Sequence, residues 1–565
     1  MTFATTKFRS LLPAATFAML VEFLMGLLSM VVAGHLLGEE ALSAVNLMQP
    51  VFNIVSFFAL MVGTGSSVLF STAIGGFQER RAHELFTQGL LSAVGIGSLL
   101  LIVLAVVRGP VLSSLGASEA VTTGAQTYWL WFLPAAVLRP VAYFLGIMCY
   151  SDGDEKICYA SYAVLLCGNL AVSIICTKAF GDLSGCALGM SVGNLLSIIV
   201  LSAHFFRKGN NLRLVRHFSL KDTFRICWCA VGDAALKLCY AVLFFLLNAY
   251  IIGRFGSEQL PVLSAVIAVM AIAEVFDGVS MAVQPLAGVY IGERNDVRTR
   301  SVMTTSVKVA VGEGLVVTMI LLAAPSLIVR LVGISDPALV GVSETAVRLS
   351  SLGLVATGLM MLFNSYYMFI DREVLAAAIT VFTMLVFPAA MFPVLGEVMG
   401  LNGVWLSMGL APTLAVLIAS LVICWKWGRS RFPYLLDPSR GANIRVFDLC
   451  LDPVEVCATA AAVEAHLKLG GLDSAKAVKA SLLLEETLMV VRDRNEGRRI
   501  LSEVTVDRND GLSLIIRDDG ELFNITDADA RISSLRGYLV SNLMTAIPNR
   551  RNLTTTGFNR NVFKL

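Results

Sequence analysis

The stretch STAIGGFQERRAHELFTQGL, residues 71–90, has a counterpart displaced by 217 positions in AGVYIGERNDVRTRSVMTTSV, residues 287–307. A second pair, LSGCALGMSVG (183–193) and LNGVWLSMGLA (401–411), is displaced by 218. Because two separate blocks share this displacement, the chain contains one long unit in duplicate. Apolar runs dominate both copies, and duplicated sets of membrane helices are typical of transporters whose binding site lies between two halves.

The composition is that of a membrane protein. Of the 565 residues, 56% are hydrophobic and 15% charged, and the mean hydropathy is +0.75. A bilayer is crossed by about 20 apolar residues. Runs of that length occupy 12–33, 47–73, 86–107, 127–150, 157–177, 184–206, 224–252, 261–290, 304–330, 344–370, 374–395 and 401–427. Since backbone groups in lipid must be satisfied within the segment, we expect an all-α membrane protein with twelve transmembrane helices in two six-helix repeats, 1–215 and 216–427.

The distribution of positive charge predicts the orientation. With the N-terminus inside, eighteen Lys and Arg residues fall on inner segments and five on outer ones. This bias predicts that both termini are cytoplasmic in a plasma membrane, and a bacterial one is expected. We interpret the basic cluster at 207–225 as a topology signal on the loop between the repeats, not as a lipid or nucleic-acid site. The eleven cysteines show no pairing at metal-ligand spacing, so no metal site and no disulfide is predicted.

The composition changes after Trp427. Residues 428–443 read as a polar linker, and 444–565 as a small α/β domain. Strands are predicted at 445–451, 502–508, 512–518 and 561–565, and helices at 453–469, 474–494 and 535–547. The two middle strands flank Asn509-Asp510-Gly511, a hairpin signal. Asp473 is predicted to cap the second helix.

Several ionisable residues lie inside apolar runs, and five of them are interpreted together: Glu22, Asp233, Lys237, Glu274 and Asp277. Placing a charge at mid-bilayer costs about 2.5–3.5 kcal/mol even on the scale that gives the lowest values. Each of these residues is therefore expected to have a functional or structural role. Asp233 and Lys237 are spaced for a direct ion pair, and Glu274 and Asp277 share one side of their helix. We interpret the group as the transport and ion-coupling site. The alternative is a structural Asp233–Lys237 pair with a carboxylate capping a polar layer.

Other polar residues in the membrane part allow two interpretations. Asn46, Gln49 and Asn53 form one stripe on the second helix, which either lines a cleft or makes helix–helix hydrogen bonds. Arg139, between Pro134 and Pro140, is interpreted as the structural partner of a carboxylate or carbonyl.

The duplicated block resembles a multidrug and toxin extrusion (MATE) transporter. The resemblance rests on VVAGHLLGEEALSAVNL (31–47), IIGRFGSEQLPVLSAV (251–266), Gln284-Pro285 with IGERN (291–295), and LNGVWLSMGLA. It implies two six-helix bundles that rock about a central cleft and exchange H⁺ or Na⁺ for an organic cation. The first, second, seventh and eighth helices would line that cleft, and Gln284 with them.

The sequence also departs from this family. Ser29 stands where many bacterial members carry an acidic residue, and Tyr240 or Ala241 where Na⁺-type members carry a glutamate. Glu22, Glu274 and Asp277 are therefore the groups left for ion coupling.

The tail resembles the ATP-binding domain shared by anti-sigma kinases, histidine kinases and gyrase, a Bergerat-type α/β sandwich. LLLEETLMVVRD (482–493), IIRDDGELFN (515–524), SLRGYLVSNLM (534–544) and TTTGFNRNVFKL (554–565) carry the resemblance. It implies that Asp518 would accept a hydrogen bond from adenine, that Gly520 would make room for the base, and that Glu486 would be the catalytic helix carboxylate. Gly537 alone represents the Gly-rich loop, and Val490 replaces the asparagine that would hold Mg²⁺. ATP or ADP binding and a degenerate domain kept for contact with a regulatory protein are both open.

The leading hypothesis is a secondary antiporter, rather than an enzyme, that exports organic cations or amphipathic drugs under control of the tail. Transport itself would need no cofactor beyond H⁺ or Na⁺. One alternative is a lipid-linked or polysaccharide flippase, whose cleft is typically richer in Arg and Lys. The other is a membrane sensor with a kinase-like tail, which Val490 argues against.

Overall fold

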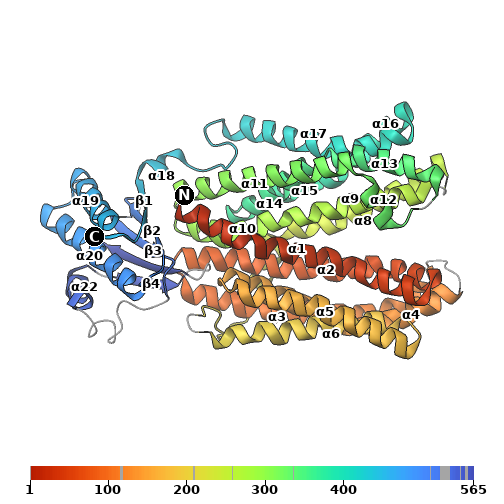
Figure 1. Cartoon of the computed structure of the whole chain (residues 1–565), viewed down its shortest axis with the longest axis horizontal. Coiled ribbons are helices and arrows are strands. Elements are labelled where there is room, and N and C mark those ends of the chain that lie inside the picture. Colours follow the sequence, from red (N-terminus) through yellow and green to blue (C-terminus); the bar gives the residue numbers. More distant parts are fainter. Residues whose placement is uncertain are drawn as a thin grey trace.

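The computed structural model describes residues 2–114, 119–207, 210–256, 259–334, 336–509, 511–521, 535–547, 549–553 and 558–565. Long helices form an elongated bundle, and the tail is attached to one end of it (Figure 1). The N-terminus lies at the same end as the tail (Figure 1). We call this the tail end of the bundle.

The first repeat contains six long helices and a short 3₁₀ turn. They are α1 (Phe3–Leu37), α2 (Glu39–Gly75), α3 (Glu79–Ser114), α4 (Glu119–Ser151), α5 (Glu155–Phe180), α6 (Ser184–Ser202) and η1 (Ala203–Phe206). Capping side chains define several starts, as where Thr2 accepts from the Thr5 amide and Asp154 from the Ile157 amide. Small residues bring α5 and α6 together, because a Cβ at Gly189 would lie only 2.1 Å from Ser173 Oγ.

The second repeat is cut into more pieces. It contains α7 (Leu220–Cys229), α8 (Val231–Phe255), α9 (Leu260–Ala273), η3 (Glu274–Phe276), α10 (Asp277–Gly292), α11 (Asp296–Ala323), α12 (Ser326–Val332), α13 (Pro337–Ser351), α14 (Leu354–Phe369), α15 (Glu373–Val381), the π-helical turn η4 (Phe382–Val386), α16 (Phe387–Met399) and α17 (Leu401–Trp427). The two repeats lie side by side along the bundle (Figure 1).

Several predicted spans need correction. Among the described residues, eleven helices are long and apolar enough to cross a membrane, or twelve if the pair α13–α14, bent by 41°, counts as one span. The span expected at 224–252 starts later, because α7 is a separate amphipathic helix that buries Asp222 and exposes Phe224. The span expected at 304–330 is interrupted at Pro325, whose ring nitrogen donates no hydrogen bond.

The tail follows a short helix, α18 (Pro438–Ala442). It contains β1 (Ile444–Cys450), α19 (Pro453–Leu469), α20 (Ser474–Arg494), β2 (Leu501–Asp507), β3 (Ser513–Asp518), α22 (Leu535–Ala546), β4 (Asn549–Leu553) and β5 (Asn559–Lys564). The strands form one antiparallel sheet in the order β1-β2-β3-β5-β4. The predicted strands and helices are confirmed to within two residues, including the Asp473 cap. The sequence analysis missed β4, because Asn-Arg-Arg-Asn-Leu lacks apolar alternation.

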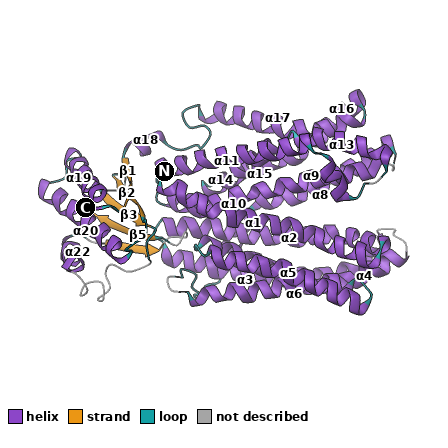
Figure 2. Cartoon of the chain, in the orientation of Figure 1, coloured by secondary structure: helices purple, strands orange, loops and turns teal. Residues whose placement is uncertain are grey.

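The sheet has two different faces. Apolar side chains such as Val504, Ile516 and Phe563 point to one face and share a core with α19, α20 and α22. The other face is turned toward the tail end of the bundle (Figures 1 and 2). Since side chains alternate along a strand, the residues between those apolar ones face the membrane part.

Candidate functional site

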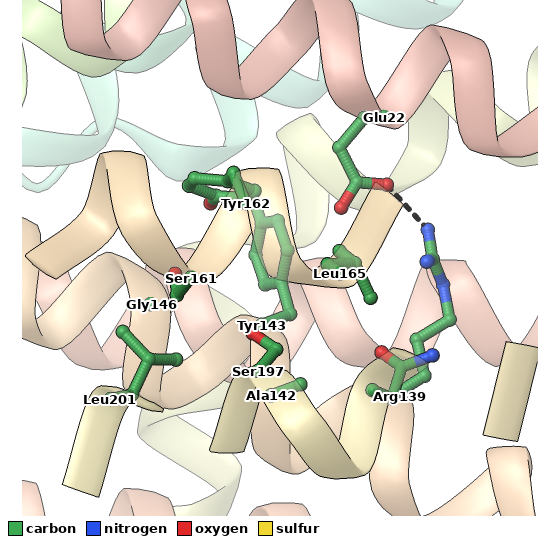
Figure 3. Close-up of a pocket in the computed structure, with 11 residues that line it drawn as sticks. Glu22, Arg139, Ala142, Tyr143, Gly146, Ser161, Tyr162, Leu165, Ser197 and Leu201 are labelled. Atoms are coloured by element: carbon green, nitrogen blue, oxygen red, sulfur yellow. Dashed lines mark hydrogen bonds and ion pairs between the residues drawn. The ribbon is translucent and has the colours of Figure 1, made fainter. Parts of the chain in front are cut away.

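An ion pair joins two helices within the first repeat. Glu22 of α1 and Arg139 of α4 point toward each other, with 2.6 Å between Oε2 and Nη2 (Figure 3). Arg139 Nε also donates to Ser56 Oγ at 3.0 Å, and its guanidinium lies 4.5 Å from the centroid of the Phe52 ring. The pocket beside this pair has polar and aromatic walls that include Tyr143, Ser161, Tyr162, Asn194 and Ser197. Arg139 is expected to be the partner of a carboxylate or a carbonyl, and the structure shows that its partner is the Glu22 carboxylate.

A second charged cluster lies where the repeats meet. Lys237 Nζ on α8 pairs with Glu274 Oε2 at 2.7 Å, and Asp233 accepts a hydrogen bond from Thr64 on α2 at 3.1 Å. This corrects the predicted Asp233–Lys237 pair: in the described structure the lysine reaches across to the next helix instead. Asp277 begins α10 directly after the turn that carries Glu274. A 3₁₀ turn therefore interrupts the expected continuous helix, and in such a turn residues i and i+3, here Glu274 and Asp277, still lie on the same side.

The balance of charge in this second cluster is negative. Three carboxylates, those of Asp233, Glu274 and Asp277, share this cluster with the ammonium group of Lys237, which pairs with Glu274. The cluster also connects the halves, since Thr64 belongs to the first repeat and Asp233 to the second. Carboxylates held away from water favour either a proton or a bound cation. This arrangement can therefore bind a cation or exchange protons.

Gln284 adds a polar group on the same side of α10 as Asp277. The two residues are seven positions apart, which places them on one helix face. The Gln284 side chain is 5% exposed, and its Oε1 has no hydrogen-bond partner among the described residues. Gln49 and Asn53 are half-buried, whereas the side chain of Asn46 lies outside the described residues.

Ser29 and Tyr240, the positions where the sequence departs from its expected family, contact aromatic residues in the structure. Tyr128 OH donates to Ser29 Oγ at 3.4 Å. Tyr240 is buried and stacks on Phe244 with 5.8 Å between ring centroids. Tyr240 also lines a second pocket, within the second repeat, together with Met270, Thr357, Thr383 and Met408. The sequence analysis did not identify this pocket, because its lining comes from seven separate helical segments.

In the tail, Asp518 and Gly520 are placed together at the end of β3. Asp518 Oδ1 accepts hydrogen bonds from the Gly520 amide at 3.1 Å and from Asn559 Nδ2 at 2.9 Å. A Cβ at Gly520 would lie 2.7 Å from Asn495 Nδ2, so only glycine fits without movement. Asp518 lies on the helix-covered side of the sheet, away from the bundle.

The Glu486 carboxylate on α20 lies near an arginine. Arg536 lies 4.0 Å from Glu486 and 3.7 Å from Asp493, both on α20. Burial raises the pKa of Glu486, and Arg536 opposes that rise. Val490 packs into the apolar core of the tail. Gly537 lies in α22, but its surroundings fall outside the described residues, as does the segment 522–534.

Four charged residues on the bundle-facing side of the sheet were missed by the sequence analysis. They are Asp448, Glu503, Arg517 and Arg560. A signal was present in the sequence, because each is a charge inside an otherwise apolar strand.

Two duplicated helical repeats with buried charges between them define a multi-pass membrane transporter. The pattern of the MatE family matches residues 14–175 and 234–393, more than half of the chain. The chain therefore belongs to the MatE family, the multidrug and toxin extrusion transporters.

Individual relatives agree with this assignment. The chain is 21% identical over 417 residues to the multidrug export protein MepA of Staphylococcus haemolyticus, covering 72% of this chain and 90% of that protein. It is similar in structure to an outward-facing multidrug-resistance MATE transporter of the MOP superfamily (TM-score 0.69, 21% identity, 76% of this chain and 96% of the other). A MOP superfamily transporter from Pyrococcus furiosus, described as having a binding pocket of reverse polarity, is similar too (TM-score 0.70, 20% identity, 77% and 97%). The match to the family pattern ends at residue 393, before the tail.

Proposed function

We propose that this transporter exports organic cations or amphipathic drugs by H⁺ or Na⁺ antiport. The observation that carries the proposal is the cluster of Asp233, Glu274 and Asp277 around Lys237, which has more carboxylates than cations at the junction of the repeats. A cationic cargo and a coupling ion would compete for such a site. The similarity to the multidrug export protein MepA supports the export of drugs.

The arrangement of the first repeat fits this proposal better than an anionic cargo. Arg139 is the cation of the first-repeat pocket, and Glu22 neutralises it at 2.6 Å. A phosphate-bearing lipid would need an unpaired cation there. We further propose that the tail end of the bundle is cytoplasmic, as the bias of Lys and Arg predicts.

The test is transport of ethidium by the purified full-length chain in proteoliposomes under an imposed pH or Na⁺ gradient. We expect Glu274→Gln and Asp277→Asn each to lower the initial rate at least severalfold, because each removes a charge from the cluster. The matched control is Glu397→Gln, since Glu397 is 59% exposed and pairs with Arg254 outside the cluster. Full transport by the Glu274→Gln/Asp277→Asn double variant would remove both residues from the mechanism.

The tail is proposed to be a regulatory domain that binds an adenine nucleotide with little or no turnover. Asp518 and Gly520 supply the acceptor and the space that the base would need. Val490 offers no oxygen to Mg²⁺, which requires oxygen ligands. Arg536 beside Glu486 supplies a positive charge in that region instead.

A further inference from the structure

A row of four charges crosses the bundle-facing side of the tail sheet. In the strand register, Asp448 of β1 is opposite Glu503 of β2, Glu503 is opposite Arg517 of β3, and Arg517 is opposite Arg560 of β5. Residues directly opposite in antiparallel strands share one face. The row is therefore acidic across β1–β2 and basic across β3–β5. We call these four residues the charged row.

The acidic half of the charged row contacts the second repeat. Arg298, near the start of α11, forms ion pairs with Asp448 at 2.6 Å and with Glu503 at 2.7 Å. The hydroxyl of Tyr290, near the end of α10, donates to Glu503 at 3.2 Å. The acidic half therefore binds the tail to the end of α10 and the start of α11.

The basic half bridges the two repeats. Arg517 and Arg560 both pair with Glu293, the residue that follows α10; the Arg560 Nη1–Oε1 distance is 2.5 Å. Arg560 Nη2 also donates to the carbonyl of Ile74 at 2.9 Å, and Nη1 to that of Gly75 at 3.3 Å. Those carbonyls end α2 of the first repeat, where a helix attracts positive charge. One side chain thus touches both halves of the transporter.

These contacts exclude water. The side chains of Glu503, Arg517 and Arg560 are 0% exposed, and that of Glu293 is 1% exposed. Burial lowers the pKa of Arg560 to about 10, although Glu293 opposes the shift, so the guanidinium stays charged at neutral pH. Buried charges are tolerated only when they are paired. Removing one partner leaves the others buried without a counter-charge, which destabilises the contact.

The bridge lies at a place where the backbones of the two repeats approach each other closely. A Cβ at Gly75 would lie 2.5 Å from the Val289 carbonyl oxygen, and one at Gly292 would lie 2.4 Å from that of Thr72. The two glycines are equivalent positions of the duplicated stretch. The backbones of α2 and α10 therefore touch at the tail end, and the bundle is closed there.

The ion pair between the tail and Arg298 has a counterpart in the first repeat. Arg81 and Arg298 are equivalent positions, 217 residues apart. Arg81 pairs with Asp222 of α7, in the segment that follows the first repeat. Arg298 pairs with Asp448 of β1, in the segment that follows the second repeat. The segment after each repeat therefore pairs an aspartate with the equivalent arginine of that repeat. The tail differs in that it also contacts the first repeat, through Arg560.

We propose that the tail is a lock: docked through the charged row, it holds the ends of α2 and α10 together and keeps the transporter closed at the tail end. The proposal rests on the proposed function, since a transporter that works by alternating access must separate these ends in each cycle. Release of the charged row from Glu293 and α2 is then a required step, and stabilising the docked tail inhibits transport.

The test compares two variants made on opposite sides of the contact, Glu293→Gln in the bundle and Arg560→Gln in the tail, in the full chain. Arg80→Gln is the matched control, because the Arg80 side chain is 93% exposed and pairs with Glu84 on its own helix. Amide hydrogen exchange in nanodiscs reports on segments 71–77 and 287–293, and ethidium transport in proteoliposomes reports on turnover. Thermal unfolding identifies a variant that fails to fold, in which case the other variant decides.

We expect both variants to exchange faster in the two segments and to transport severalfold faster than the wild type and the control. If the strands of the tail lose protection while segments 71–77 and 287–293 stay protected, the tail does not hold the bundle closed and the lock is wrong. Unchanged exchange in both variants contradicts it equally, since the charged row would not be what docks the tail. If no protein transports ethidium, the proposed function fails, and the exchange data still decide the lock.

Discussion

At the scale of single residues, the choice of partner decides what the membrane charges can do. Lys237 has an acidic neighbour one turn away in its own helix, Asp233, and another across the helix interface, Glu274. In the structure it pairs with Glu274, while Asp233 is held by Thr64 from the other repeat. Lysine has a long, flexible side chain, so spacing along one helix does not decide between two carboxylates.

This assignment predicts which pair is coupled. Lys237→Met should destabilise the protein by about 1–3 kcal/mol, because it strands the Glu274 carboxylate in a partly buried site. Adding Glu274→Gln should recover much of that loss, whereas Lys237→Met and Asp233→Asn should add independently. Double-mutant cycles on thermal unfolding in detergent check this. Coupling found for Asp233 and absent for Glu274 would restore the pair expected from helix spacing.

At the scale of helices, the duplicated stretch has a physical reason for its glycines. Gly75 and Gly292 occupy the ends of α2 and α10, where each faces the backbone of the other helix. A backbone carbonyl cannot rotate away as a flexible side chain can. Any larger residue must therefore push the two helices apart.

We expect Gly75→Ala or Gly292→Ala to cost about 1–3 kcal/mol, the usual range for overpacking, and to weaken closure at the tail end. Gly95→Ala is the control, since a Cβ there meets nothing within 4 Å. In a helix that change should be neutral or stabilising. Thermal unfolding measures the cost, and hydrogen exchange of 71–77 measures closure. Equal stability of all three variants would mean that the helix ends relax without loss.

At the scale of the whole molecule, the alternation of the strands gives the tail two separate surfaces. Val504 and Ile516 face the tail helices, on the side where Asp518 lies, while Glu503 and Arg517 face the bundle. The docking surface and the proposed nucleotide site are thus on opposite sides of one sheet. A nucleotide can therefore bind without displacing the charged row directly. Any effect of nucleotide binding on docking of the tail must then be transmitted through the sheet.

For the full-length chain, we expect ADP and ATP to bind with similar affinity and with little dependence on Mg²⁺. Arg536, not a metal ion, is the positive charge beside Glu486, and Val490 provides no metal ligand. Calorimetry with and without Mg²⁺ measures this, and Asp518→Asn should abolish binding while Glu496→Gln, at an exposed position, should not. Tight, Mg²⁺-dependent ATP binding with turnover would show that another residue replaces the asparagine. The folded chain failing to bind either nucleotide would leave the tail as a contact domain.

The sequence by itself determined the duplication, the helical membrane fold and most of the tail's strands and helices. These follow from patterns along the chain: apolar runs of bilayer length, period-two strands and capping residues. It also predicted that Arg139 is the partner of a carboxylate or a carbonyl. It could not determine where the helices of the second repeat break, because Pro325 and the Glu274–Phe276 turn sit inside runs that read as continuous.

Only the tertiary structure decided which charges meet. Glu22 and Arg139 are 117 positions apart, Glu293 and Arg560 are 267 apart, and no local pattern relates them. The same holds for the charged row, since a charge in an apolar strand reads as solvent-facing until the other domain is placed against it. Local composition sets which surfaces are apolar, but the partners of buried charges are set by packing between segments far apart in the chain.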